Sequence, residues 1–132
     1  MTNATGERTL PLTAPSTWVA ALAAVLFLGL GLRALLAPAG AAALFGVPLD
    51  GGQGLAFVQG VGARNIGLSL VTLALIGLDV RMGLVAVFFA AALIAGLDFS
   101  IVATHTGALR AAKHLGYVAG LAGFGFWFAL RR

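Results

Sequence analysis

The segment TWVAALAAVLFLGLGLRALLA, residues 17–37, decides the fold, because it is long and almost entirely apolar. A helix needs about 20 mostly apolar residues to cross roughly 30 Å of hydrocarbon, so the segment predicts a membrane-spanning helix. A cleaved signal peptide is the alternative, because Ala37, Pro38 and Ala39 resemble a small-residue cleavage site. The apolar stretch exceeds the roughly 7–15 residues of signal peptides, and Arg33 precedes the site, so we expect the segment to be retained.

Three further segments are long and apolar, at residues 53–77, 82–104 and 111–130. The connections between them, LDVR (78–81) and HTGALR (105–110), are short. Short connections make consecutive helices neighbours that run in opposite directions. The sequence therefore predicts an all-α integral membrane protein, a four-helix bundle with antiparallel up-down-up-down topology.

The remainder of the chain consists of a tail and a connector. Residues 1–16 are polar with two prolines and predict a disordered tail, which leaves residues 17–132 as one four-span transmembrane domain. Residues 38–52, between Pro and Gly, predict a connector with one short helical turn at 40–45. Four spans place both termini on one side, together with Arg81, and the slight excess of positive charge there favours cytoplasmic termini.

Composition supports a bilayer as the solvent for most of the chain. Hydrophobic residues make up 61% of the 132 residues and charged residues only 9%, against roughly a quarter in soluble domains. The absence of cysteine excludes disulfides, thiolate catalysis and thiolate-ligated metals. The net charge of +4 comes from residues scattered at segment ends, which favours anionic lipid headgroups over nucleic acid as a partner.

Small residues form stripes on two of the expected spans. The stripe on the second span consists of Ala56, Gly60, Ala63, Gly67 and Ala74. The stripe on the fourth span consists of Gly116, Gly120 and Gly123. Small residues at helical spacing allow helices to approach closely in a membrane. We therefore expect helix–helix contacts at these faces, within the bundle or in a homo-oligomer. Arg64, within about 40° of Gly60 on a helical wheel, is expected on the packed face of the second span.

Ionisable residues are concentrated in one half of the predicted bundle. Asp98 and His105 lie seven residues apart on one face of the third span, and His114 and Tyr117 share a face of the fourth. Arg64 lies about 16 Å along the second span, at a similar depth. A lone charge near the centre of a span costs about 2.5–3.5 kcal/mol on insertion scales, so we expect Arg64 to pair with Asp98.

The residues expected to carry chemistry are Asp98, Arg64, His105 and His114, with Asp98 or a histidine as general acid or base. Four further residues are expected to contact a ligand: Asn65, Gln59, Tyr117, Arg33. A purely structural ion pair and histidines that bind headgroups or water are the alternatives. We expect no metal, because neither ExxH nor HxxxH spacing is present, and no other cofactor.

Four short motifs occur along the chain: LFGVP (44–48), GARNIGLSL (62–70), AGLDF (95–99) and the HTG…KH pattern (105–114). In these motifs the chain resembles a family of small four-span proteins catalogued as domain of unknown function 4267, and the resemblance covers nearly everything after residue 16. It implies a helical membrane bundle with a shared polar site. The position of Asn65 is often acidic in the family, so the amide here leaves Arg64 more dependent on Asp98.

Three functions fit these observations, and the sequence leaves open whether the protein is an enzyme. The first is a membrane-embedded site that binds or converts a small amphipathic molecule by acid–base isomerisation, cyclisation or hydrolysis. The second is a structural or accessory protein that contacts partners through its glycine stripes. The third is an oligomeric proton-coupled small-molecule transporter, for which Asp98 is the titratable carboxylate.

Overall fold

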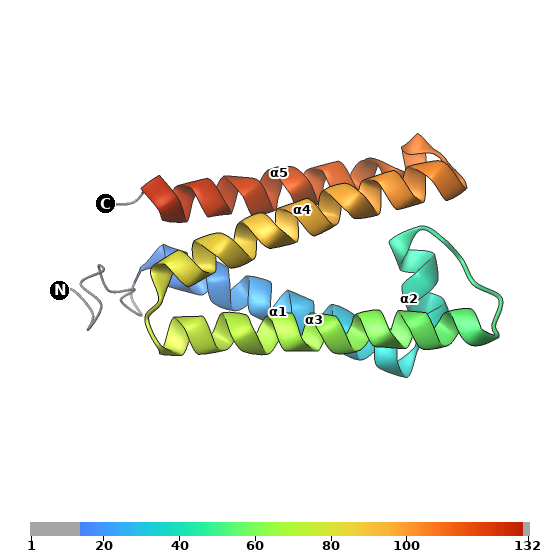
Figure 1. Ribbon diagram of the computed structural model, residues 1–132, viewed down its shortest axis with the longest axis horizontal. Coiled ribbons are helices and arrows are strands. Elements are labelled where there is room, and N and C mark those ends of the chain that lie inside the picture. The colour runs from blue at the N-terminus through green and yellow to red at the C-terminus, as the bar shows by residue number, and fades with distance from the viewer. Residues whose placement is uncertain (1–13, 131–132) are drawn as a thin grey trace.

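The computed structural model describes residues 14–130, and this part of the chain is helical without strands. Figure 1 shows the long helices lying lengthwise, with the short helix α2 at one end. The helices are α1 (Pro15–Leu36), α2 (Pro38–Phe45), α3 (Gln53–Gly77), α4 (Arg81–Thr106) and α5 (Ala108–Leu130).

The long helices form two pairs. α1 packs mainly along α3, and α4 packs mainly along α5, whereas α3 and α4 contact each other much less. The pairs form two layers, and α2 lies between the layers at one end of the molecule (Figure 1). The short turn between α3 and α4 joins the two pairs without packing these helices together along their length.

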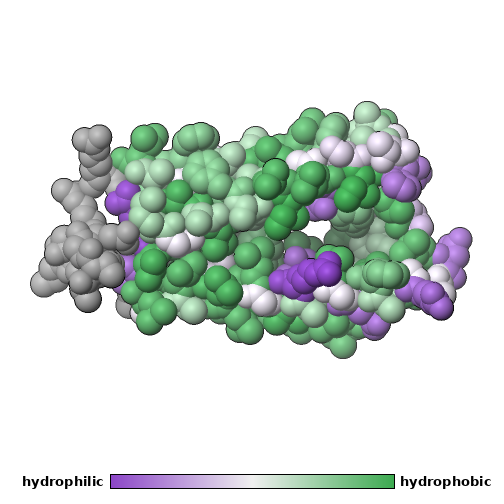
Figure 2. All heavy atoms as spheres, viewed as in Figure 1, coloured by the Kyte–Doolittle hydropathy of each residue, from purple (hydrophilic) through white to green (hydrophobic). Residues whose placement is uncertain are grey.

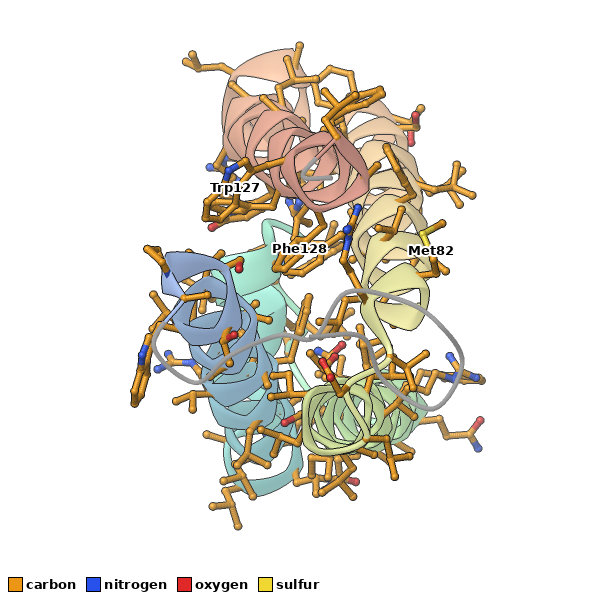
Figure 3. The ribbon with its side chains drawn as sticks, turned by 90° about the vertical axis from the view of Figure 1, so that its left-hand side faces the viewer. Met82, Trp127 and Phe128 are labelled. Carbon is orange, nitrogen blue, oxygen red and sulfur yellow. The ribbon has the colours of Figure 1, made fainter. Side chains whose placement is uncertain are left out.

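The two pairs meet in a hydrophobic core at the end opposite α2. The core contains Ala20 of α1, Phe128 of α5 and three residues of the first turns of α4: Leu84, Val85, Phe88. The rings of Phe88 and Phe128 stack with centroids 5.3 Å apart. Figure 3 shows Phe128 turned inward between the helices, whereas Met82 points outward from α4. The two pairs are therefore joined firmly at this end of the molecule.

At this same end, Arg81 ties the start of α4 to the end of α5. Its Nε donates a hydrogen bond to the Phe128 carbonyl (2.8 Å), and its Nη2 donates to the Ala129 carbonyl (3.1 Å). The last carbonyls of a helix have no partner within the helix and carry partial negative charge, so a guanidinium stabilises them well.

The backbones of α1 and α3 cross in close contact at Gly31 and Gly62. A Cβ on Gly62 would lie 2.7 Å from the Gly31 carbonyl oxygen, and a Cβ on Gly31 would lie 2.7 Å from that of Gly62. Only glycine fits at both positions. Such contacts are the main attraction between helices in lipid, where the hydrophobic effect gives none.

Local sequence explains the ends of α2. Pro38 occupies its first turn, where the missing N–H costs nothing. Gly46 ends it in the left-handed region with φ of 117°, and a Cβ there would lie 2.8 Å from Val102. The expected single turn at 40–45 is thus an eight-residue helix, packed against α1 and α3.

The helix bounds can be compared with the predicted segments. α3 covers the same residues as the second apolar segment, and α4 and α5 extend slightly beyond the third and fourth. α1 begins at Pro15, so residues 15–16 are helical and not part of a disordered tail. Residues 1–13 of the expected tail lie outside the described residues.

Three of these helices, α1, α3 and α4, are long and apolar enough to cross a membrane. Large apolar side chains are exposed along all of the long helices, including Leu22, Leu70, Leu93 and Phe126. Figure 2 accordingly shows a surface that is mainly hydrophobic, with hydrophilic groups at the ends. These features are those of an integral membrane protein.

Candidate intramembrane polar site

Polar side chains of α4 and α5 bind the end of α2. Thr106 Oγ1 donates to the Gly46 carbonyl (2.9 Å), His114 Nε2 donates to the Phe45 carbonyl (3.0 Å), and Lys113 Nζ donates to the Leu44 carbonyl. We call these three side chains and three carbonyls the α2 junction. The terminal carbonyls of α2 lack partners within the helix. The ammonium and the imidazole donate hydrogen bonds to them and stabilise their partial negative charge.

His114 is the centre of the α2 junction. Its side chain is buried, and its ring makes edge-to-face contacts with Phe45 (centroids 5.2 Å apart) and Tyr117 (5.7 Å). Asp98 is partly buried and lies within electrostatic range of His114. The structure therefore brings together Asp98, His114 and Tyr117, three of the eight residues expected at the site.

Arg64 does not form the expected ion pair with Asp98. Its side chain is exposed, and it has no hydrogen bond or ion pair to any residue within 14–130. The prediction was wrong because α3 packs on α1, not along α4, so a shared depth in two consecutive helices did not bring the side chains together.

A shallow hollow of about 190 Å³ lies beside Arg64 on α3, lined also by Ala56, Phe57 and Gly60. We call it the α3 hollow. A Cβ on Gly60 would meet nothing within 4 Å, so this face of α3 is open. In Figure 2, a hydrophilic patch interrupts the apolar surface over α3, beside an opening between the two layers of helices.

The other expected site residues lie apart from both groups. His105 is exposed, and its Nδ1 donates to the Ile101 carbonyl of its own helix (2.9 Å). Gln59 donates to the Leu35 carbonyl (3.2 Å) and so ties α3 to the end of α1. Asn65 is partly buried on α3, and Arg33 is exposed in the last turn of α1, near Gly40 of α2.

The expected small-residue stripes are not packed within this chain. Gly60 and Gly67 of α3, and Gly116, Gly120 and Gly123 of α5, each have open space where a Cβ would be. The close contact uses Gly62 instead, on another face of α3. The α5 stripe borders a groove of about 430 Å³ between α5 and α1, lined by Val19, Ala119, Gly120, Gly123, Phe124 and Trp127.

This arrangement can support binding and proton transfer. Among residues 14–130, no three histidine, cysteine or acidic side chains gather closely enough to hold a metal ion. Asp98 and His114 can exchange a proton with a bound molecule, but the His114 Nε2–H is already committed to Phe45. Arg64 is the cation in the middle of a long helix that remains available to an anion.

Part of the polar region was not assigned to a site from the sequence. This part consists of Thr106, Lys113 and the carbonyls of α2. A sequence signal exists, because a helix that ends in glycine needs donors for its last carbonyls. The donors lie some 60 or 69 residues further along the chain. Spacing along the sequence therefore could not identify them.

Residues 24–128 match the model of DUF4267, a domain of unknown function. The chain belongs to the DUF4267 family. The match spans α2, α3 and α4 completely and reaches the last turn of α5, so both the α2 junction and the α3 hollow lie within the DUF4267 domain. Among curated proteins and solved structures, none matches this chain.

Proposed function

We propose that this DUF4267 protein crosses the bilayer four times, as an antiparallel bundle of α1, α3, α4 and α5 with both termini in the cytoplasm. The 23 residues of α5 are long enough, at 1.5 Å each, to cross about 30 Å of hydrocarbon. The turn at Asp79 would then lie on the cytoplasmic side, and the turn at Gly107 on the opposite side.

The absence of native cysteine makes this topology directly testable. Leu78→Cys, at the end of α3, and Leu109→Cys, in the first turn of α5, place single thiols beside the two turns, at side chains that are exposed. In intact cells, a membrane-impermeant maleimide should label Leu109→Cys, and should label Leu78→Cys only after permeabilisation. Labelling of both from outside would contradict a crossing of the membrane by α4, which lies between the two positions, and the reverse pattern would contradict the orientation.

Within that topology, the protein binds a small amphipathic molecule at the α3 hollow. The observation that carries this proposal is the open face of α3, where an exposed Arg64 lines an apolar hollow. Figure 2 shows a hydrophilic patch over α3, beside an opening between the two helix layers. Pockets for small molecules are mostly apolar with few polar groups that fix orientation. A gap between helices that pack weakly on each other allows entry from the lipid.

The proposal concerns binding and not conversion, because the expected acid–base residues Asp98 and His114 do not line the α3 hollow. His114 and Lys113 are instead engaged in holding α2. The expectation that His114 acts directly on a substrate would require the α2 junction to open.

The test is whether a small molecule stays with the purified protein. Gly60→Leu fills the α3 hollow, and Gly29→Leu is the matched control, because Gly29 on α1 also has open space around it. Mass spectrometry of the protein in mild detergent should find a retained molecule in the wild type and in Gly29→Leu, but not in Gly60→Leu. Equal retention by both variants, or none by the wild type, would refute the proposal.

A second candidate is an accessory membrane protein that contacts partner helices through α5. The exposed stripe of Gly116, Gly120 and Gly123 favours it, because small residues allow close helix contacts in lipid. Gly120→Leu should then abolish assembly with the partner, or with a second copy, while Gly60→Leu should not.

A further inference from the structure

We infer that the molecule bound at the α3 hollow carries a single anionic group, a carboxylate or a phosphodiester, which pairs with Arg64. This inference rests on the proposed function and specifies its ligand. It starts from the position of Arg64, which lies one residue from the middle of the 25-residue helix α3.

The depth of Arg64 makes a partner necessary. Each half of α3 is about 18 Å long, so a side chain at its middle cannot reach a membrane surface fully by snorkelling. A charged residue at this depth is costly unless it faces water or an opposite charge. Within residues 14–130 the protein supplies Arg64 with neither an ion pair nor a hydrogen bond.

The charged residues around the opening specify the sign of the ligand's charge and the number of its charged groups. Of the cations on the same side of the bundle, Lys113 is occupied by the Leu44 carbonyl. Asp98, the acidic side chain of α4, lies within range of His114 and leaves Arg64 uncompensated. Arg64 is the one guanidinium that lines the α3 hollow, and it matches one anionic group, which it can bind through two parallel hydrogen bonds.

The apolar part of the ligand has a matching surface. Phe57 lies seven residues before Arg64, so the two share one face of α3 about 10 Å apart. Phe57 is 78% exposed, and Ala56 and Gly60 between them leave the hollow open. A head group at Arg64 therefore places an acyl chain against Phe57, which describes a fatty-acid-like molecule or an anionic phospholipid.

The inference can be tested with protein in phosphatidylcholine nanodiscs. A long-chain fatty acid and the alcohol of the same length differ only in the head group. We expect the wild type to bind the acid at least about tenfold more tightly than the alcohol. Arg64→Gln should remove this preference, Arg64→Lys should retain part of it, and Arg110→Gln, at the exposed start of α5, should keep it.

The outcomes separate this inference from the proposed function. Equal binding of acid and alcohol by the wild type would overturn the anionic head group and leave the amphiphile site intact. Binding of neither would overturn both. Displacement of the fatty acid by phosphatidylglycerol, added in place of part of the phosphatidylcholine, would support the anionic site and identify bulk lipid as its source.

Discussion

The α2 junction and the α3 hollow both place polar residues among apolar helices, but they differ in how those residues are satisfied. At the junction, Thr106, Lys113 and His114 each bind a carbonyl of α2, and His114 is buried between two aromatic rings. At the hollow, Arg64 is exposed and binds no residue within 14–130. The polar groups of the junction are engaged in holding the fold, whereas Arg64 remains available to a partner outside residues 14–130.

The same contrast exists between two faces of α3. One face is packed against α1 at Gly62, and the other is open at Gly60 and Arg64. Substitutions on the packed face and at the junction should therefore affect stability, and substitutions on the open face should affect binding.

The largest effect is expected at the crossing of α1 and α3. Gly62→Ala should lower the free energy of unfolding by about 3 kcal/mol, because its Cβ would lie 2.7 Å from the Gly31 carbonyl oxygen and the backbones must separate. Gly60→Ala, two residues away, should change it by less than about 1 kcal/mol, since alanine is the better helix former and the space is open.

Unfolding of both variants in a detergent titration, followed by circular dichroism, measures this difference. Similar losses for Gly60→Ala and Gly62→Ala would mean that both faces of α3 are packed. The distinction between an engaged face and an open face would then be lost.

A smaller effect is expected at the α2 junction. His114→Ala should cost about 2 kcal/mol, because it removes a 3.0 Å hydrogen bond to Phe45 and two edge-to-face ring contacts. His105→Ala is the matched control on α4: its exposed ring bonds only within its own helix and the change should cost less than about 0.5 kcal/mol. A catalytic His114 without a structural role would instead lose activity at unchanged thermal stability.

The smallest effect on stability is expected at Arg64. Arg64→Gln should change the free energy of unfolding in detergent by no more than about 0.5 kcal/mol, as a surface substitution does, because no described residue depends on Arg64. The melting temperature of the protein measures this change. A loss of more than about 2 kcal/mol would show that Arg64 has a partner that holds the fold, and the contrast with His114 would disappear.

The sequence predicted the helices better than it predicted their partners. The apolar run of residues 53–77 has the same bounds as α3, because Gly51 and Gly52 precede it and a short turn follows. The face of a helix that small residues mark is visible in the spacing. Whether another helix covers that face depends on distant residues, so the stripe through Gly60 was expected to be packed, whereas the contact is made by Gly31 and Gly62.

Only part of the candidate site was predicted, because the contacts between helices depend on residues far apart in the sequence. His114 and Tyr117, which were predicted on one face of the fourth span, have their rings in contact. Asp98 lies within electrostatic range of His114, because α4 and α5 are joined by a single residue and pack along each other. Arg64 was assigned to this group from its depth and from its place on the small-residue face of α3, which was expected to be packed. Depth fixes the position of a residue along the bundle but not its angle around it, and the pairing of α1 with α3 turned Arg64 away.

The most direct test of the central claim is to map where an anionic amphiphile touches the protein. A fatty acid with a photoreactive diazirine near its carboxylate would be crosslinked to the protein in nanodiscs, and the labelled residues identified by mass spectrometry. We predict labelling of α3 around Phe57 and Gly60 in the wild type and its loss in Arg64→Gln. Labelling spread over the exposed apolar residues of every helix, or unchanged in the variant, would contradict the account.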